Sequence, residues 1–240
     1  MDPRITELSN GNYVLNNRGW DNGTIRDAGA VTWCSGTVGL SGVVNSSNSL
    51  VGTSSGDFVG NRIIELSNGN YLVSSPSWKN GLLFRAGAVT WCSGITGITG
   101  EINSSNSLIS SEANNLLGNT IISLDNGNYV VGNGSWDNGA IVNAGAVTWG
   151  NGMTGITGLA NSNNSLVGST AEDRVGGRGI IALSNGNYVV SSPTWDNSTS
   201  VDVGAVTWCN GTTGLSGTVN SSNSLVGSTA GDQVGGNNGG

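Results

Sequence analysis

Two loops that recur along the chain carry the side chains best suited to chemistry. One holds the triplet Trp-x-Asn, in which x is Asp in three of the four copies. The other holds an acidic residue in the pattern Asp-x-Val-Gly, with asparagine in its place in the second copy. In chain order these residues are Trp20-Asp21-Asn22, Asp57, Trp78-Lys79-Asn80, Asn115, Trp136-Asp137-Asn138, Asp173, Trp195-Asp196-Asn197 and Asp232.

An aromatic ring beside a carboxylate and an amide is a common way to hold carbohydrate. The ring packs on sugar C–H groups, and the polar pair bonds the hydroxyls. We therefore predict a ligand-binding surface made of these tryptophans, aspartates and asparagines, with Lys79 and Asn115 left out. Several weak equivalent sites would add to one another by multivalency.

The same residues have a structural interpretation, which is the stronger one for the tryptophans. A tryptophan repeated in every unit is usually wedged between neighbouring sheets, and Asp-Asn-Gly is ordinary turn chemistry. A second tryptophan ends each Gly-Ala-Val-Thr-Trp segment, whose alternating pattern predicts that this residue belongs to the core. These residues are Trp33, Trp91, Trp149 and Trp208.

Enzymatic chemistry finds little support in the residues present. The chain has no histidine, which excludes Ser-His and Cys-His arrangements. A pair of carboxylates of the glycosidase kind stays open, with Asp57, Asp173 and Asp232 as the residues that could meet across a channel. Repeated positions filled by like residues usually serve geometry, so we expect no enzyme activity and no cofactor.

The cysteines and the charge argue against metal and nucleic-acid binding. Cys34, Cys92 and Cys209 occupy one repeat position, which predicts free thiols rather than disulfides. Isolated cysteines cannot supply the four ligands of a zinc site. A net charge of −7 with eight lysines and arginines disfavours nucleic acid. No apolar run approaches the ~20 residues that cross a bilayer, so no membrane insertion is expected.

Four tandem units organise the chain. Tyr13, Tyr71, Tyr129 and Tyr188 lie 58 or 59 residues apart, each within Asn-Gly-Asn-Tyr. Only 10% of residues are charged and 41 are glycine, but apolar positions recur in register, which excludes low-complexity disorder. We predict one repeat domain spanning residues 1–240, with units 5–62, 63–120, 121–179 and 180–240.

Each unit predicts four short strands. In the second unit, segments 63–66 and 71–74 flank Asn-Gly, a strong hairpin signal that we assign to a two-residue type I′ turn. Segment 87–91 places Val89 and Trp91 on one face and small side chains on the other, and a fourth strand lies near 106–109. Sheets with one bulky and one small face can stack face to face.

The sequence thus predicts an all-β fold, a β-propeller of four four-stranded antiparallel blades. The alternative is a parallel β-solenoid, in which a hairpin in every unit has no natural place. Every predicted blade is contiguous, so no exchanged strand latches the two ends of a ring. We favour a compact ring that closes by packing. An open array that pairs with another copy or with further repeats is the alternative.

The repeated sequence motifs resemble those of known families. Asn-Tyr-Val-Val-Ser-Ser-Pro followed by Gly-Ala-Val-Thr-Trp is similar to FG-GAP blades, the integrin-type propeller repeat. The words resemble still more closely the tandem repeats of large secreted bacterial proteins of the filamentous-haemagglutinin type. This resemblance implies an extracellular setting, an adhesive or structural role and no enzymatic activity. The calcium loop common in FG-GAP blades is absent, since the hairpins lack alternating aspartates, so we predict no calcium, with isolated Asp125 as the nearest candidate.

We therefore expect a non-catalytic extracellular repeat domain for adhesion or glycan binding on a bacterial surface or secreted protein. The alternative is a structural spacer or self-assembling module without a small ligand. Expected partners are glycans or a host or neighbouring cell surface, and self-association is possible. Residues 1–4 lack the features of a signal peptide, and we expect the chain to be part of a longer protein.

Overall fold

The computed structural model describes residues 4–236, a range that contains strands and turns and no helix. The all-β prediction is confirmed. Residues 1–3 and 237–240, which the predicted domain includes, lie outside the described residues. Two compact units are present: unit 1 is Met1–Asn119 with Gly152–Leu159, and unit 2 is Thr120–Asn151 with Ala160–Gly240. Within 4–236 no helix has the length and apolar character needed to traverse a bilayer.

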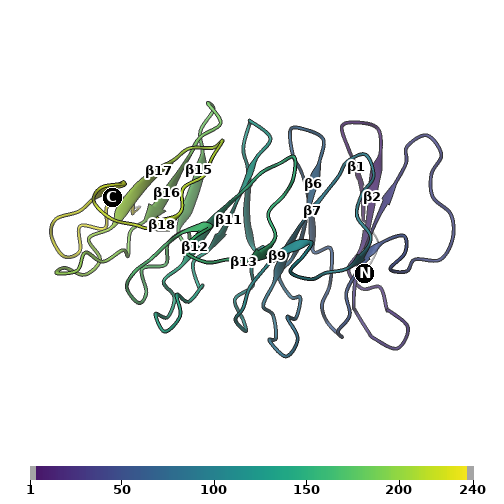
Figure 1. The fold of residues 1–240 in the computed structure, drawn as a ribbon, viewed down its shortest axis with the longest axis horizontal. Helices are drawn as coiled ribbons and strands as arrows, with labels where there is room; N and C mark the ends of the chain where they lie inside the picture. Colours follow the sequence, from purple (N-terminus) through teal and green to yellow (C-terminus); the bar gives the residue numbers. More distant parts are fainter. Residues whose placement is uncertain (1–3, 237–240) are drawn as a thin grey trace. The chain divides into compact units, whose positions relative to one another are not determined.

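Every repeat builds the same antiparallel sheet of four strands, in the predicted order. Figure 1 shows the strands of these sheets as arrows joined by loops. The first repeat contains β1 (Arg4–Glu7), β2 (Tyr13–Asn17), β3 (Ala30–Cys34) and β4 (Leu50–Val51). The second contains β5 (Arg62–Glu65), β6 (Tyr71–Ser75), β7 (Ala88–Cys92) and β9 (Ser107–Ile109). The third contains β10 (Thr120–Ser123), β11 (Tyr129–Asn133), β12 (Ala146–Gly150) and β14 (Ser165–Val167). The fourth contains β15 (Gly179–Ala182), β16 (Tyr188–Ser192), β17 (Ala205–Cys209) and β19 (Ser224–Val226).

Three sheets gain a fifth strand from the following repeat, which the sequence did not predict. These strands are β8 (Gly100–Glu101), β13 (Gly158–Leu159) and β18 (Gly217–Thr218). They pair in parallel with β4, β9 and β14 respectively. We call the segments that carry them the hooks: residues 97–102, 155–160 and 214–219. Residues 39–44 are the equivalent segment of the first repeat. Each hook therefore satisfies the edge of its neighbour's sheet.

The Asn-Gly hairpins are confirmed, but their turn type differs from the prediction. In the first repeat, the Leu8 amide donates to the Asn12 carbonyl (2.8 Å) and the Gly11 amide to the Leu8 carbonyl (2.9 Å). Gly11 has a φ of +83°, whereas Asn10 is not left-handed. The loop therefore has three residues, a type I turn followed by a left-handed glycine, rather than a two-residue type I′ turn. This geometry leaves the Asn10 side chain free to bond another repeat.

The core lies between sheets, as the alternation of bulky and small side chains predicted. In unit 1, Val31 and Trp33 of β3 pack with Ala88 and Cys92 of β7, and Leu50 is fully buried in the same cluster. In unit 2, the third and fourth repeats form the equivalent cluster around Val147, Leu166 and Ala205. Fully burying one such aliphatic side chain contributes about 1.5–3 kcal/mol, so each interface contributes substantially to stability.

The described strands form no closed barrel, and no strand of the fourth repeat pairs with the first within residues 4–236. The ring that a propeller requires is therefore not shown. What is shown is a set of four repeat sheets, three with five strands and one with four.

Candidate functional site

The two loops that carry the predicted site lie against each other within a repeat. In the first repeat, the Phe58 amide donates to the Asp27 carbonyl and the Val59 amide to the Ala28 carbonyl, both at 3.0 Å. In the first three repeats, the asparagine of the Trp-x-Asn triplet also connects these two loops by a hydrogen bond. The side-chain amides of Asn22, Asn80 and Asn138 donate to the carbonyls of Gly52 (3.1 Å), Ser110 (2.9 Å) and Gly168 (3.2 Å).

The fourth asparagine and the triplet aspartates also bond inside the loop. Asn197 accepts from the Ser198 hydroxyl at 3.4 Å. A carboxylate oxygen of each triplet aspartate accepts a backbone amide six residues later in the chain. The pairs are Asp21 with Asp27 (2.8 Å), Asp137 with Asn143 (2.7 Å) and Asp196 with Asp202 (2.7 Å). These polar side chains therefore shape their own loop.

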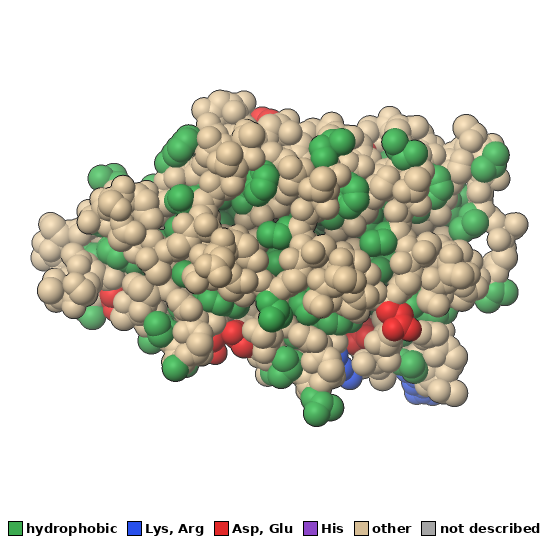
Figure 2. Space-filling model, viewed as in Figure 1, with side chains coloured by type: hydrophobic (Ala, Val, Ile, Leu, Met, Phe, Trp, Pro, Cys, Tyr) green, Lys and Arg blue, Asp and Glu red, His purple; other side chains and the backbone are tan. Residues whose placement is uncertain are grey.

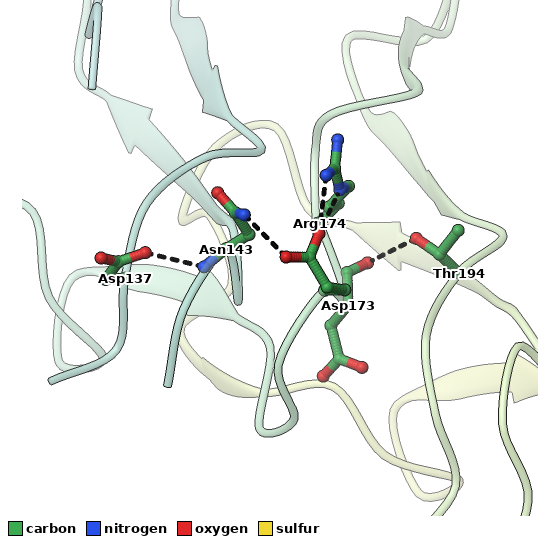
Figure 3. A network of polar contacts seen from close by, with 6 residues as sticks. Asp137, Asn143, Asp173, Arg174 and Thr194 are labelled. Carbon is green, nitrogen blue, oxygen red and sulfur yellow. Dashed lines mark hydrogen bonds and ion pairs between the residues drawn. The ribbon is translucent and has the colours of Figure 1, made fainter. Parts of the chain in front are cut away.

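Figure 3 shows how this network continues in unit 2. The Asn143 side chain donates to Glu172 (2.8 Å), which also pairs with Arg174. The bond from Asn143 and the nearby Arg174 guanidinium lower the pKa of Glu172. The Thr194 hydroxyl donates to the Asp173 backbone carbonyl at 3.1 Å. Polar contacts thus connect the loops of the third repeat to the fourth.

Asp57 and Asp173 join consecutive repeats. One oxygen of Asp57 accepts the Thr53 and Ser54 amides of its own loop, at 3.0 and 2.8 Å. The other accepts the Lys79 amide of the second repeat at 3.1 Å. Asp173 repeats this arrangement, with Ser169 and Thr170 at 2.8 Å and Asp196 of the fourth repeat at 2.9 Å. Both carboxylates have no solvent exposure.

Burial raises the pKa of Asp57 and Asp173 above the ordinary value for an aspartate, and the backbone hydrogen bonds offset this effect only in part. A raised carboxyl pKa is often a sign of an active site. Here both oxygens of each group are occupied by amide donors, and no solvent reaches them. The perturbation is therefore explained by their position between repeats.

Three of the four loop tryptophans are inside the protein. Trp78, Trp136 and Trp195 are each 5% exposed. Trp78 packs in the core cluster shared by the first two repeats, and Trp195 in the one shared by the last two. Trp20 is half-buried. This placement supports the structural interpretation for the three buried rings, which present no face to a sugar.

Asp232, the third predicted aspartate, differs from its counterparts. One of its oxygens accepts the Ser228 and Thr229 amides at 2.9 and 2.8 Å. Its side chain is exposed, and among the described residues its other oxygen has no donor. The oxygen that joins repeats in Asp57 and Asp173 is therefore open at this position.

A second set of contacts between repeats was missed by the sequence analysis, and we call it the glycine clamp. The side chains of Asn10, Asn12 and Trp33 all donate to the carbonyl of Gly94 in the second repeat, at 2.8, 3.0 and 3.0 Å. In unit 1 the same three positions, Asn68, Asn70 and Trp91, donate to Gly152. In unit 2 they are Asn126, Asn128 and Trp149, and they donate to Gly211.

The clamp explains why two sequence motifs recur in every repeat. Asn-Gly-Asn and Gly-Ala-Val-Thr-Trp place two amides and one indole around a carbonyl of the next repeat. That carbonyl belongs to glycine for a steric reason, since a Cβ on Gly94 would lie 1.8 Å from the Gly69 carbonyl oxygen. The recurrent Gly two residues after each cysteine position was the signal available in the sequence.

A cavity of about 230 Å³ lies beside Trp33 in unit 1. Its walls include Ser47, Asn48, Thr96 and Thr99, so an aromatic ring borders hydroxyl and amide groups. Strand alternation predicted that Trp33 and its three equivalents belong to the core, but Trp33, Trp91 and Trp149 are only half-buried and Trp208 is exposed. An aromatic side chain and polar groups therefore line one accessible hollow, the arrangement that was predicted for the loops.

No group of three or more acidic, cysteine or histidine side chains within 4–236 has the geometry to hold a metal ion. The three cysteines are buried as free thiols, as predicted. Figure 2 shows a face made mainly of uncharged polar side chains and backbone, with few charged groups.

The family comparison matches all four repeats. A model of the DUF5650 family, described as a repeat of unknown function, matches residues 7–61, 65–119, 123–177 and 182–236. No protein with a curated description matches the chain. The match does not connect these repeats to the FG-GAP or filamentous-haemagglutinin families, so those resemblances stay predictions.

Proposed function

Since the chain belongs to the DUF5650 family of repeats, we propose from its contacts that it is a non-catalytic structural module in which stacked sheets hold one another in place. One observation carries the proposal: the side chains best suited to bind a ligand or to catalyse a reaction are used to join repeats. Asp57 and Asp173 give both carboxylate oxygens to backbone amides, and three loop tryptophans lie in interfaces or core.

Two further features support a structural role. The glycine clamp and the hook connect each repeat to the next by side chains and by strand pairing. Trp208 is 54% and Leu225 72% exposed, whereas Leu50, Leu108 and Leu166 are fully buried, so these positions are buried where a following repeat packs on them.

We propose a secreted or cell-surface setting on a bacterial protein, with adhesion as the wider role. This proposal rests on the resemblance of the repeats to surface-protein repeats and on a surface rich in uncharged polar groups (Figure 2). Host or neighbouring cell surfaces are the proposed partners.

Glycan binding is the second candidate function, and the cavity beside Trp33 is the observation that favours it. Stacking of a sugar on the indole, with hydrogen bonds to Ser47, Asn48 and Thr99, would use the chemistry expected of a carbohydrate site. The Trp-x-Asn loops that contain Trp136 and Trp195 are poorer candidates for a sugar-binding site, because those two rings are buried.

A glycan array with two matched variants separates the candidates. Thr99→Trp would fill the cavity, while Ser41→Trp places the same bulk at the equivalent exposed position of the first repeat. A structural module predicts no reproducible binding by any of the three proteins. Binding that disappears in Thr99→Trp and persists in Ser41→Trp would replace the structural proposal with the glycan one.

A further inference from the structure

The repeat interface inside the chain defines two complementary faces. The back face of a repeat is the side that the following repeat covers, and the front face is the opposite side. In unit 1, the back face of the first repeat, with Leu8, Val14 and Leu50, packs on the front face of the second, with Tyr71 and Trp78. The hook, the glycine clamp and the bridging aspartate complete this interface.

No other sheet within residues 4–236 packs on the back face of the fourth repeat. Leu225 is 72% exposed and Trp208 is 54% exposed. The corresponding leucines of the other repeats, Leu50, Leu108 and Leu166, are fully buried. The sheet β15-β16-β17-β19 also has only four strands, because no described segment pairs with the outer edge of β19.

The polar parts of the same face are also unoccupied. Asn185, Asn187 and Trp208 hold the three clamp positions, but their side-chain nitrogens have no acceptor among residues 4–236. Asp232 offers an exposed oxygen where Asp173 accepts the Asp196 amide. This face therefore combines apolar groups, hydrogen-bond donors, an acceptor and a free strand edge. In the third repeat, the equivalent groups all contact the fourth repeat.

The front face of the first repeat supplies the missing partners. Ile5 is 72% exposed, while its equivalents Ile121 and Ile180 are 9% exposed. Tyr13 and Trp20 are half-buried, while Tyr188 and Trp195 at the same positions are buried. Residues 39–44 form no strand, although the equivalent hooks become strands when they pair with a neighbour.

We propose that the uncovered back face of the fourth repeat binds the front face of the first repeat of a second copy of this chain, so that copies associate head to tail. The inference rests on the proposed structural function. By equivalence with the pairing of β14 and β18, Gly42 and Val43 of one copy pair in parallel with Leu225 and Val226 of the other. The Gly36 carbonyl of the incoming copy enters the clamp, and its Asp21 amide bonds Asp232.

We infer that the partner is a second copy because the same kind of interface already joins repeats within the protein. The two faces have matching shapes, because each is a version of faces that pack together in both units. A head-to-tail contact uses different surfaces on the two copies, so it is heterologous and permits growth beyond a dimer. Self-association of this kind therefore depends on concentration.

Sedimentation velocity of the 240-residue chain over a wide concentration range tests the proposal. Ile5→Asp blocks the front face and Leu225→Asp the back face, and both side chains are 72% exposed, so the fold is expected to persist. Leu82→Asp, at a fully exposed leucine in a loop, controls for the added charge. We expect the wild type and the control to associate, and each blocked variant to associate at least tenfold more weakly.

Mixing the two blocked variants gives the decisive outcome. Ile5→Asp retains its back face and Leu225→Asp its front face, so the mixture should form 1:1 dimers that do not grow. A wild type that stays monomeric at the highest concentration overturns the proposal, as does association unaffected by either substitution. Association of the wild type without dimers in the mixture indicates like faces in contact and also overturns it.

Failure here is distinguishable from failure of the structural function. A monomeric chain that binds no glycan leaves the structural module intact and removes only head-to-tail association. Circular dichroism verifies folding of each variant. If Leu225→Asp fails to fold, Trp208→Ala, at a 54% exposed position, replaces it as the back-face variant.

Discussion

Replacing Asp173 with alanine tests whether the bridging carboxylate holds repeats together. The substitution removes the acceptor of three backbone amides, those of Ser169, Thr170 and Asp196. Hydrogen bonds to a charged group contribute about 1.5–3 kcal/mol each. Burial of the charge outweighs the preference of these bonds for the ionised form, which is why the pKa of Asp173 is raised, so the net contribution is smaller than the sum of the bonds. We therefore expect a net loss of about 2–4 kcal/mol in the free energy of unfolding.

Asp232 provides a matched control within the same chain. It holds the same loop position and accepts two loop amides, but it is exposed and has no bond to a following repeat among the described residues. Asp232→Ala should therefore cost less than half as much as Asp173→Ala. Urea unfolding followed by tryptophan fluorescence gives both values, analysed for more than one transition, since repeat arrays can lose cooperativity.

Amide hydrogen exchange locates the effect. In Asp173→Ala, exchange of the Asp196 amide should accelerate, because this amide donates across the interface to the lost carboxylate. Equal losses of stability at Asp173 and Asp232, with unchanged protection of the Asp196 amide, would refute the idea that the carboxylate joins the third and fourth repeats.

Three further outcomes are expected. The fully buried thiols of Cys92 and Cys209 should react with Ellman's reagent at least tenfold more slowly in the native protein than in urea, because burial raises both pKa values, that of Cys209 to about 11. Gly211→Ala should destabilise by about 2–4 kcal/mol, since the new Cβ lies 1.7 Å from a carbonyl oxygen, whereas Gly179→Ala, with its nearest atom at 3.8 Å, should be tolerated in urea unfolding. The pKa of Asp173 is higher in the folded protein than the ordinary aspartate value, so its protonated form stabilises the fold. This stability is fully present below the ordinary aspartate pKa and is lost as pH rises through the raised folded-state pKa. Over that pH window the wild type should therefore lose stability relative to Asp173→Asn.

The sheets themselves could be predicted because their signals are local. Alternation in Gly-Ala-Val-Thr-Trp determines which side chains face a neighbour, and the turn glycine determines where the chain reverses. The observed packing of Val31 and Trp33 on Ala88 and Cys92 follows from that alternation alone. The turn type was wrong, and the side chain of Asn10 is used by another repeat, a requirement that is invisible within one hairpin.

The hooks and the clamp could not be predicted because their structure depends on a neighbour. Gly100–Glu101 is a two-residue strand with no alternation, and it exists because the edge of β4 offers hydrogen-bonding groups. The equivalent residues 42 and 43 have the same local character and form no strand. Neighbouring repeats also close part of the predicted ligand loops: Asp57 accepts the Lys79 amide of the second repeat, and both Asp57 and Trp78 are buried.

The third repeat shows how a sheet compensates for the loss of one side chain. Strand register places each front-face tyrosine opposite the cysteine position, as in the pair Tyr71 and Cys92, but Tyr129 lies opposite Gly150. A Cβ on Gly150 would lie 2.2 Å from the Tyr129 ring, so the ring occupies the space that the cysteine takes elsewhere. Loss of a side chain in one strand is thus compensated by the ring of its cross-strand partner, which keeps the packing around this sheet dense. Keeping the volume filled while the chemistry changes from thiol to aromatic is what packing requires, and it is not what recognition of a particular ligand would require.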